Sequence, residues 1–164
     1  VMFRDMRRKN QSVSADRCVE ILKRATSGVL AVSGDDGYPY AVPLSFAYDD
    51  GKIYFHCALT GHKLDAIARN DKVSFCVIDT DQVVPAEFNT LFRSVIAFGR
   101  ARLLDRSDDK RKALELLAVR YDSPLDDRLE KEIESQLDRV CLVEITVEHL
   151  TGKQSIELAR MEQA

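Results

Sequence analysis

The sequence predicts a mainly β fold with flanking helices, in which six antiparallel strands curl into a small barrel. Strand-like runs follow one another closely, and two of the connecting turns contain Asp-Asp-Gly, a strong hairpin signal. Gly99 lies inside a long strand-like run, where glycine is typical of a bulge or bend. The chain has neither a βαβ rhythm nor a GxGxxG motif, which argues against a Rossmann domain. Its length suits a single domain, residues 1–164.

The first third of the chain predicts a helix followed by a three-stranded meander. The helix is expected over 15–25, because Ser14 precedes a one-sided apolar pattern and Gly28 follows its end. Strands are expected over 28–33, 40–50 and 52–57. Pro43 has no N–H to donate to a ladder, so its strand is expected at a sheet edge or locally unpaired.

The rest of the chain alternates between helical and strand-like patterns. The expected elements are a short helix over 61–70, a strand over 72–79, a loop over 80–90, a long strand over 91–105, a helical insertion at about 107–137, a last strand over 139–150, and a turn with a short helix over 151–160. Ser123 and Pro124 are expected to divide the insertion into two helices.

The composition argues against several classes of function. The net charge is −3 and the isoelectric point about 5.7, so no basic surface typical of nucleic-acid binding is expected. No apolar run approaches the roughly 18 residues of a membrane span. The four cysteines show no CxxC spacing and no export signal is visible, so we expect reduced thiols in a cytoplasmic protein.

The stretch HCALTGHK, residues 56–63, concentrates side chains that carry chemistry. No metal site is expected, because the chain's three histidines do not supply a convincing set of three or four ligands. A nucleophile pair of Cys57 and His62 would have to form across the turn, and nothing else in the sequence supports it.

The order of the predicted elements in this stretch favours a phosphate site. A strand ends at His56 and Cys57, a turn of small residues follows, and a helix begins near His62 and Lys63. The free N–H groups of a helix start attract anions, and a lysine there adds a charge. The stretch alone is equally compatible with surface charges on a short helix. The segment 42–45 favours a ligand, since unpaired backbone groups around a proline can face a flat ring; the alternative is an edge strand whose proline blocks aggregation.

Three stretches, in this order, resemble the pyridoxamine 5′-phosphate oxidase-like FMN-binding split-barrel family: YPYAVPLSFAYDDGKIYFHCALTGHKLDAIARNDKVSFCVID, FRSVIAFGRARLL and DRVCLVEITVEHLTGK. Within this family the chain is most similar to the 5-nitroimidazole-resistance (NimA-type) flavoproteins. The resemblance extends from about Phe3 to Arg160. It implies a six-stranded split barrel that forms a homodimer with FMN at the subunit interface.

The resemblance also implies roles for individual residues. The implied cofactor-binding residues are Val42, Pro43, Leu44, Ser45, His56, Cys57, His62, Lys63 and Ser94. The segment 42–45 would line the isoalloxazine ring, His62 and Lys63 would hold the phosphate, and Ser94 would reach the flavin from a neighbouring strand. His62 is the candidate catalytic residue, as a proton donor, although a simple phosphate contact is an equal alternative. A contribution of Thr151–Lys153 to the partner's site stays open.

These roles imply an FMN-dependent two-electron reductase of small molecules such as nitroaromatics, with NAD(P)H or another protein as electron source. A non-catalytic flavin- or haem-binding protein and a split barrel with little cofactor are the alternatives. A pyridoxamine-phosphate-oxidase-like oxidase is a further one, but the chain has no Trp, and His62 stands where those oxidases usually carry arginine.

Overall fold

The computed structural model describes residues 3–120 and 126–162 of the chain. The strands are β1 (Ser12–Val13), β2 (Ser27–Ser33), β3 (Pro39–Ser45), β4 (Ala47–Asp49), β5 (Lys52–Cys57), β6 (Lys72–Val84), β7 (Asn89–Leu103) and β8 (Cys141–Gln154). The helices are α1 (Ala15–Arg24), α2 (His62–Arg69), α3 (Ser107–Val119), α4 (Asp127–Gln136) and α5 (Ile156–Met161), with short 3-10 turns η1 (Lys9–Gln11), η2 (Asp35–Gly37) and η3 (Pro85–Glu87).

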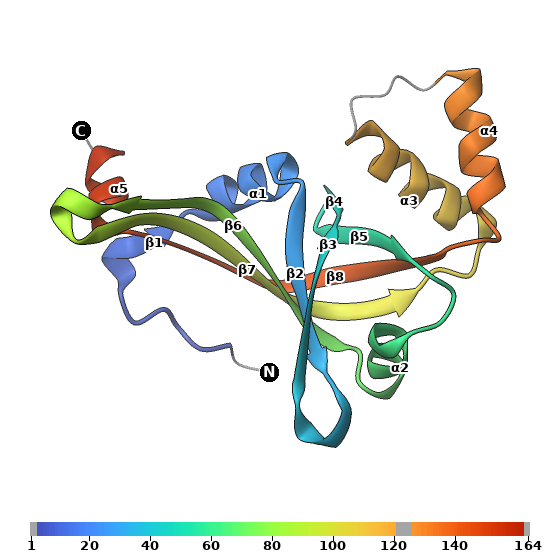
Figure 1. Ribbon diagram of the computed structural model, residues 1–164, viewed down its shortest axis with the longest axis horizontal. Helices are drawn as coiled ribbons and strands as arrows, with labels where there is room; N and C mark the ends of the chain where they lie inside the picture. Colours follow the sequence, from blue (N-terminus) through green and yellow to red (C-terminus); the bar gives the residue numbers. More distant parts are fainter. Residues whose placement is uncertain (1–2, 121–125, 163–164) are drawn as a thin grey trace.

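All the strands belong to one antiparallel sheet that curls into an incompletely closed barrel. The strand order is β3-β2-β6-β7-β8-β5-β4, and β1 pairs with β8 outside this path. The two strands at the ends of the order, β3 and β4, are separated in sequence by Phe46 alone. The sheet must therefore bend round to bring its two ends together, and Figure 1 shows the β2–β3 hairpin crossing the long strands. The predicted mainly β split-barrel class is confirmed.

The strand count differs from the six that were expected, because the described residues form eight strands. The expected strand over 40–50 is divided at Phe46, whose buried ring packs edge-on against Phe75 with centroids 4.9 Å apart. The loop expected over 80–90 was wrong: the β6–β7 ladder continues from Thr80–Arg93 to Val84–Asn89. This part of the hairpin extends away from the barrel as a two-stranded arm (Figure 1), so its sequence lacks an apolar alternation.

Three local predictions about the backbone are confirmed. The tight turn between β4 and β5 consists of Asp50 and Gly51 with positive φ angles of 42° and 76°, as a hairpin turn of type I′ requires. Pro43 lies on β3, an edge strand whose one partner among the described strands is β2. At Gly99 the β7–β8 register shifts, and an added Cβ would lie 2.2 Å from the Thr146 carbonyl oxygen.

The turn expected at the start of 151–160 was also wrong, because β8 continues through Gln154. The close approach of α1 and β1 explains why a glycine, Gly152, occurs inside this strand. A Cβ at this position would lie 2.4 Å from the Cys18 Sγ and 2.7 Å from the Val13 Cβ. Gly152 therefore lets α1 and β1 pack directly against β8, and the short helix follows only at α5.

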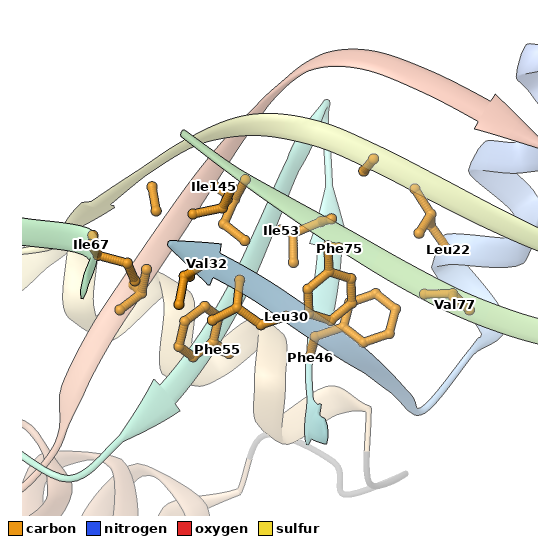
Figure 2. Close-up of a cluster of buried hydrophobic side chains, with 14 of the residues drawn as sticks. Leu22, Leu30, Val32, Phe46, Ile53, Phe55, Ile67, Phe75, Val77 and Ile145 are labelled. Carbon is orange, nitrogen blue, oxygen red and sulfur yellow. The ribbon is translucent and has the colours of Figure 1, made fainter. Parts of the chain in front are cut away.

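The main core fills the curled sheet beneath α1 and α2. It includes Ile21 and Leu22 of α1, whose N-terminus is capped by the Ser14 side chain, as predicted. Figure 2 shows side chains from strands on both sides of the barrel meeting here: Leu30, Val32, Phe46, Ile53, Phe55, Phe75, Val77 and Ile145. The inward face of each strand is thus fixed, and the alternate residues must face outward.

A second, smaller core holds the helical insertion against the barrel. Buried residues of α3 and α4 pack over β4, β5 and β8, among them Leu114, Leu117 and Ile133. Figure 1 shows this helix pair at the opposite end of the molecule from α5. The predicted break at Ser123–Pro124 lies outside the described residues.

Candidate functional site

The phosphate site predicted from HCALTGHK corresponds to the end of β5 and the start of α2. Gly61 caps the helix with a φ of +148°, a conformation that favours glycine. Its carbonyl oxygen accepts the N–H groups of Leu64 and Asp65. Because glycine has no side chain to cap the helix, the N–H groups of His62 and Lys63 in the first turn are available to an anion.

His62 is held against the β2–β3 hairpin. Its ring stacks on Tyr40 with centroids 4.2 Å apart, and its Nε2 lies 3.5 Å from an Asp35 carboxylate oxygen. Arg69 binds the other Asp35 oxygen at 2.6 Å, so the carboxylate is shared between two basic groups. Tyr40 and Asp35 were missed in the sequence, where neither residue stands at a spacing that suggests contact with His62.

Lys63 lies near the thiol of Cys57. The pKa of Cys57 is raised to about 11, chiefly by burial and also by the neighbouring Cys141 thiol, while the Lys63 ammonium group acts in the opposite direction. Cys57 and Cys141 are direct partners across the β5–β8 ladder. Lys63 and Cys57, which stand six positions apart in the sequence, are therefore brought together, as the predicted strand–turn–helix order requires.

The predicted ring-binding residues of β3 divide between its two faces. Val42 and Leu44 pack against the main core, whereas Pro43 and Ser45 are exposed. β3 pairs with β2 along one edge only, and its other edge has no strand partner among the described residues. Side-chain contacts with one ligand could come from only one of these faces, but the free backbone edge is common to all four residues.

His56 is exposed, and its side chain lies on the opposite face of β5 from Cys57, which packs against the core. His56 and Cys57, which are adjacent in the sequence, therefore face different surroundings. Cys57 faces the Lys63 side, while His56 stands opposite Leu142 in the ladder.

Ser94 lies far along the sheet from Cys57 within one chain. Its partners across the sheet are Ile78 and Lys153. Lys153 is twelve residues along β8 from Cys141, the partner of Cys57, which corresponds to roughly 40 Å along an extended strand. A single protomer does not bring Ser94 and Lys63 to one ligand phosphate.

A cavity of about 500 Å³ lies at a different place, on the outward side of the sheet. It lies between the β2–β3 hairpin, β6, β7 and the N-terminal segment, whose Phe3 ring stacks on His149 at 4.6 Å. Its lining residues include Ala31, Ser74 and Phe98, and none of the predicted site residues lines it. No pattern in the sequence predicts this cavity, because its walls come from five separate segments of the chain.

Buried charge gathers at a second place, around Glu144 of β8. The carboxylate accepts hydrogen bonds from Arg102 at 2.8 Å and from Lys52 and Tyr54, both at 3.1 Å. Burial opposes ionisation of Glu144, but the hydrogen bonds from Arg102 and Lys52 lower its pKa overall. Burial of the Tyr54 hydroxyl and the neighbouring Glu144 carboxylate raise the pKa of Tyr54. We therefore interpret this cluster as a structural ion pair.

Within residues 3–120 and 126–162, no three His, Cys, Asp or Glu side chains come together in a way that could hold a metal ion. No helix in the same ranges has the length and apolar character needed to cross a membrane.

Comparison with known proteins places this fold in a family. The family model described as pyridoxamine 5′-phosphate oxidase matches residues 14–154. No curated protein sequence matches the chain. A conserved hypothetical protein from Mycobacterium tuberculosis has a similar structure, with a TM-score of 0.81, 19% identity, and 98% and 94% of the two chains covered.

Two further solved structures have the same fold. One is described as a candidate 5-nitroimidazole antibiotic resistance protein from Bacteroides thetaiotaomicron, with a TM-score of 0.74, 21% identity, and 87% and 86% coverage. The other is an FAD- and haem-binding protein from Mycobacterium smegmatis, with a TM-score of 0.72, 21% identity, and 90% and 74% coverage. At these identities the structures establish the fold, while the match over residues 14–154 shows that the chain belongs to the pyridoxamine 5′-phosphate oxidase family.

Proposed function

We propose that the chain forms a homodimeric FMN-binding protein that catalyses two-electron reduction of small molecules such as nitroaromatics. The observation that carries the proposal is the start of α2, where Lys63, the open first-turn N–H groups and the end of β5 converge. Membership of the pyridoxamine 5′-phosphate oxidase family supports a flavin as the ligand.

The residues at the start of α2 fit the terminal phosphate of FMN. A phosphate dianion would accept hydrogen bonds from the N–H groups of His62 and Lys63 and from the Lys63 ammonium group. Gly61 removes the side chain that would otherwise occupy this position. His62 would add a second cation when protonated, in competition with its contact to Asp35.

The edge of β3 fits the flat ring of a flavin. Pro43 has no N–H and its neighbours have unpaired backbone groups along this edge, so the strand offers polar contacts beside apolar side chains. Val42 and Leu44 would supply the apolar surface, because they lie on the same face as Tyr40, which contacts His62.

Bound FMN would supply two-electron redox chemistry, which reduction of a nitro group requires. The chain would bind it, exclude water from one side of the ring and provide protons. His62 is the proposed proton donor, because its ring is held in place by Tyr40 and is about one-third exposed at 38%. His56, exposed at the end of β5, is the alternative.

The homodimer is supported by the outward face of the sheet, which carries the apolar side chains Val29, Ala31, Cys76, Ile78, Ile96 and Phe98. We call this surface the outer face. Ile78 is 65% exposed there, beside Ser94. A second copy covering the outer face would bury these residues and carry its own Ser94 to the flavin of the first protomer. Such an arrangement would account for the separation of Ser94 and Lys63 within one chain.

The proposal is tested on purified protein. We expect a flavin absorbance spectrum, with FMN as the mass released on denaturation and one FMN per chain. Anaerobic photoreduction followed by metronidazole should reoxidise the flavin, and NADH and NADPH can then be compared as electron donors. Absence of flavin would refute the binding proposal, whereas a stable reduced flavin in the presence of metronidazole would refute nitroreduction alone.

A second candidate, a non-catalytic flavin- or haem-binding protein, is favoured by the similar fold of the FAD- and haem-binding protein from Mycobacterium smegmatis. A Soret band in the purified protein, or released FAD in place of FMN, would support this candidate. Pyridoxamine 5′-phosphate added aerobically tests for oxidase activity, and production of pyridoxal 5′-phosphate would favour that alternative over the reductase.

A further inference from the structure

Two cysteines face each other at the end of the β5–β8 ladder. Cys57 is the last residue of β5, Cys141 is the first residue of β8, and the two are direct partners in the antiparallel ladder. Both thiols are free, partly exposed and in contact with the edge of the main core. Cys18 and Cys76 differ: Cys18 is buried in α1, and Cys76 stands opposite Val29 and Ile96.

The backbone already holds this pair at a separation that suits a disulfide. Directly opposed residues of an antiparallel ladder have Cα atoms about 4.5–5.5 Å apart, within the roughly 4.4–6.8 Å that disulfides span. Their Cβ atoms lie about 4.5–5.5 Å apart, so closing the bond requires a movement of about 1 Å. Both residues are strand ends, where the ladder stops and such a movement disturbs few hydrogen bonds.

Each of the two thiols has an ammonium group nearby. Burial raises the pKa of both thiols. The Lys63 ammonium group opposes this rise at Cys57, and the Lys110 ammonium group opposes it at Cys141. Either thiolate, once formed, therefore lies beside a positive charge and opposite the second thiol of the pair.

We propose that Cys57 and Cys141 are a redox-active thiol pair, which a peroxide converts into a cross-strand disulfide at the end of the β5–β8 ladder. The thiolate of one cysteine attacks a peroxide oxygen, the O–O bond breaks, and a sulfenic acid and hydroxide form. The sulfur of the other cysteine then displaces the sulfenic hydroxyl group, and the S–S bond forms. For hydrogen peroxide, two thiols lose two protons and two electrons, and the peroxide becomes two molecules of water.

This inference goes beyond the proposed function and does not depend on it, because no flavin takes part in the reaction. The cysteine pair is nevertheless connected to the proposed phosphate site at the start of α2. Cys57 immediately precedes the turn that leads to Lys63, so a bond to Cys141 fixes the strand end from which the proposed phosphate site is built. Oxidation would thus act on the geometry of that turn.

The test uses full-length protein with and without hydrogen peroxide. We expect loss of two of the four free thiols, loss of two hydrogens in intact mass, and one linked peptide that contains Cys57 and Cys141. Dithiothreitol should reverse all three changes. Since the disulfide closes a loop of more than eighty residues, the Tm should rise by roughly 10 °C. The oxidation rate should increase up to about tenfold per pH unit through pH 9, because burial keeps both thiols protonated at neutral pH.

Matched cysteine variants separate this pair from general thiol oxidation. Cys141→Ser should lose the linked peptide and the rise in Tm, whereas Cys76→Ser should keep both. Peptide mapping of the wild-type protein decides the question even where a variant folds poorly. Four remaining free thiols after peroxide treatment, or a linked peptide containing Cys18 or Cys76, would overturn the proposal.

Discussion

Replacing Lys63 with alanine tests the proposed phosphate site most directly. Lys63 is half-buried at the start of α2, and its ammonium group lies close enough to Cys57 to oppose the rise in the pKa of that thiol. A charge-assisted hydrogen bond to a phosphate contributes roughly 1.5–3 kcal/mol. Because Lys63 is partly exposed, solvent screening places its contribution at the lower end, about 1.5–2 kcal/mol. The Kd for FMN should therefore rise about 10–30-fold.

The assay is a fluorescence titration of FMN into apo-protein, with riboflavin as a second ligand. Riboflavin has the same ring and ribityl chain without the phosphate, so its Kd should be nearly the same for the wild-type protein and Lys63→Ala. Lys131→Ala is the matched control, since it removes an exposed lysine from α4. The reasoning is refuted if Lys63→Ala leaves the FMN affinity unchanged or weakens FMN and riboflavin equally.

Three further predictions concern packing, pH and assembly. Gly152→Ala should lower the free energy of unfolding in urea by about 1–3 kcal/mol, because the new Cβ would lie 2.4 Å from the Cys18 Sγ. Glu144 has a lowered pKa in the fold, so its contribution is present above its unfolded pKa, near 4.3, and is lost as pH falls. Urea titrations from pH 6 to 3 should show a smaller decrease in stability for Glu144→Gln than for the wild-type protein. Ile78→Asp should shift the mass in light scattering from dimer to monomer, whereas an unchanged dimer would contradict an interface at the outer face.

Much of the fold follows from local chemistry that the sequence displays. The turn of Asp50 and Gly51, the proline of the edge strand and the bulge at Gly99 each depend on the backbone limits of one residue type. The two errors have a different origin. The arm over 80–90 is stabilised by pairing between its own strands and needs no apolar side, and Gly152 is required by the approach of α1 from elsewhere in the chain.

The candidate site shows the same division between local and distant information. The order of strand, turn and helix in residues 56–63 predicts an anion site, because a helix start is a property of neighbouring residues. The contacts of His62 with Tyr40 and Asp35 depend on where the β2–β3 hairpin lies relative to α2. The pairing of Cys57 with Cys141 depends on the register of two strands separated by the whole helical insertion, which no spacing in the sequence reveals.

The position of Ser94 links the site to the assembly. Within one chain, Ser94 lies on the outer face, beside Ile78, and Lys63 lies at the start of α2, which follows the end of β5. If both residues serve one flavin, that flavin must lie between two protomers, and each outer face must be covered by a second copy. The assembly and the cofactor site would then be a single feature. Loss of the dimer in Ile78→Asp should therefore weaken FMN binding although every phosphate contact proposed for Lys63 remains in place.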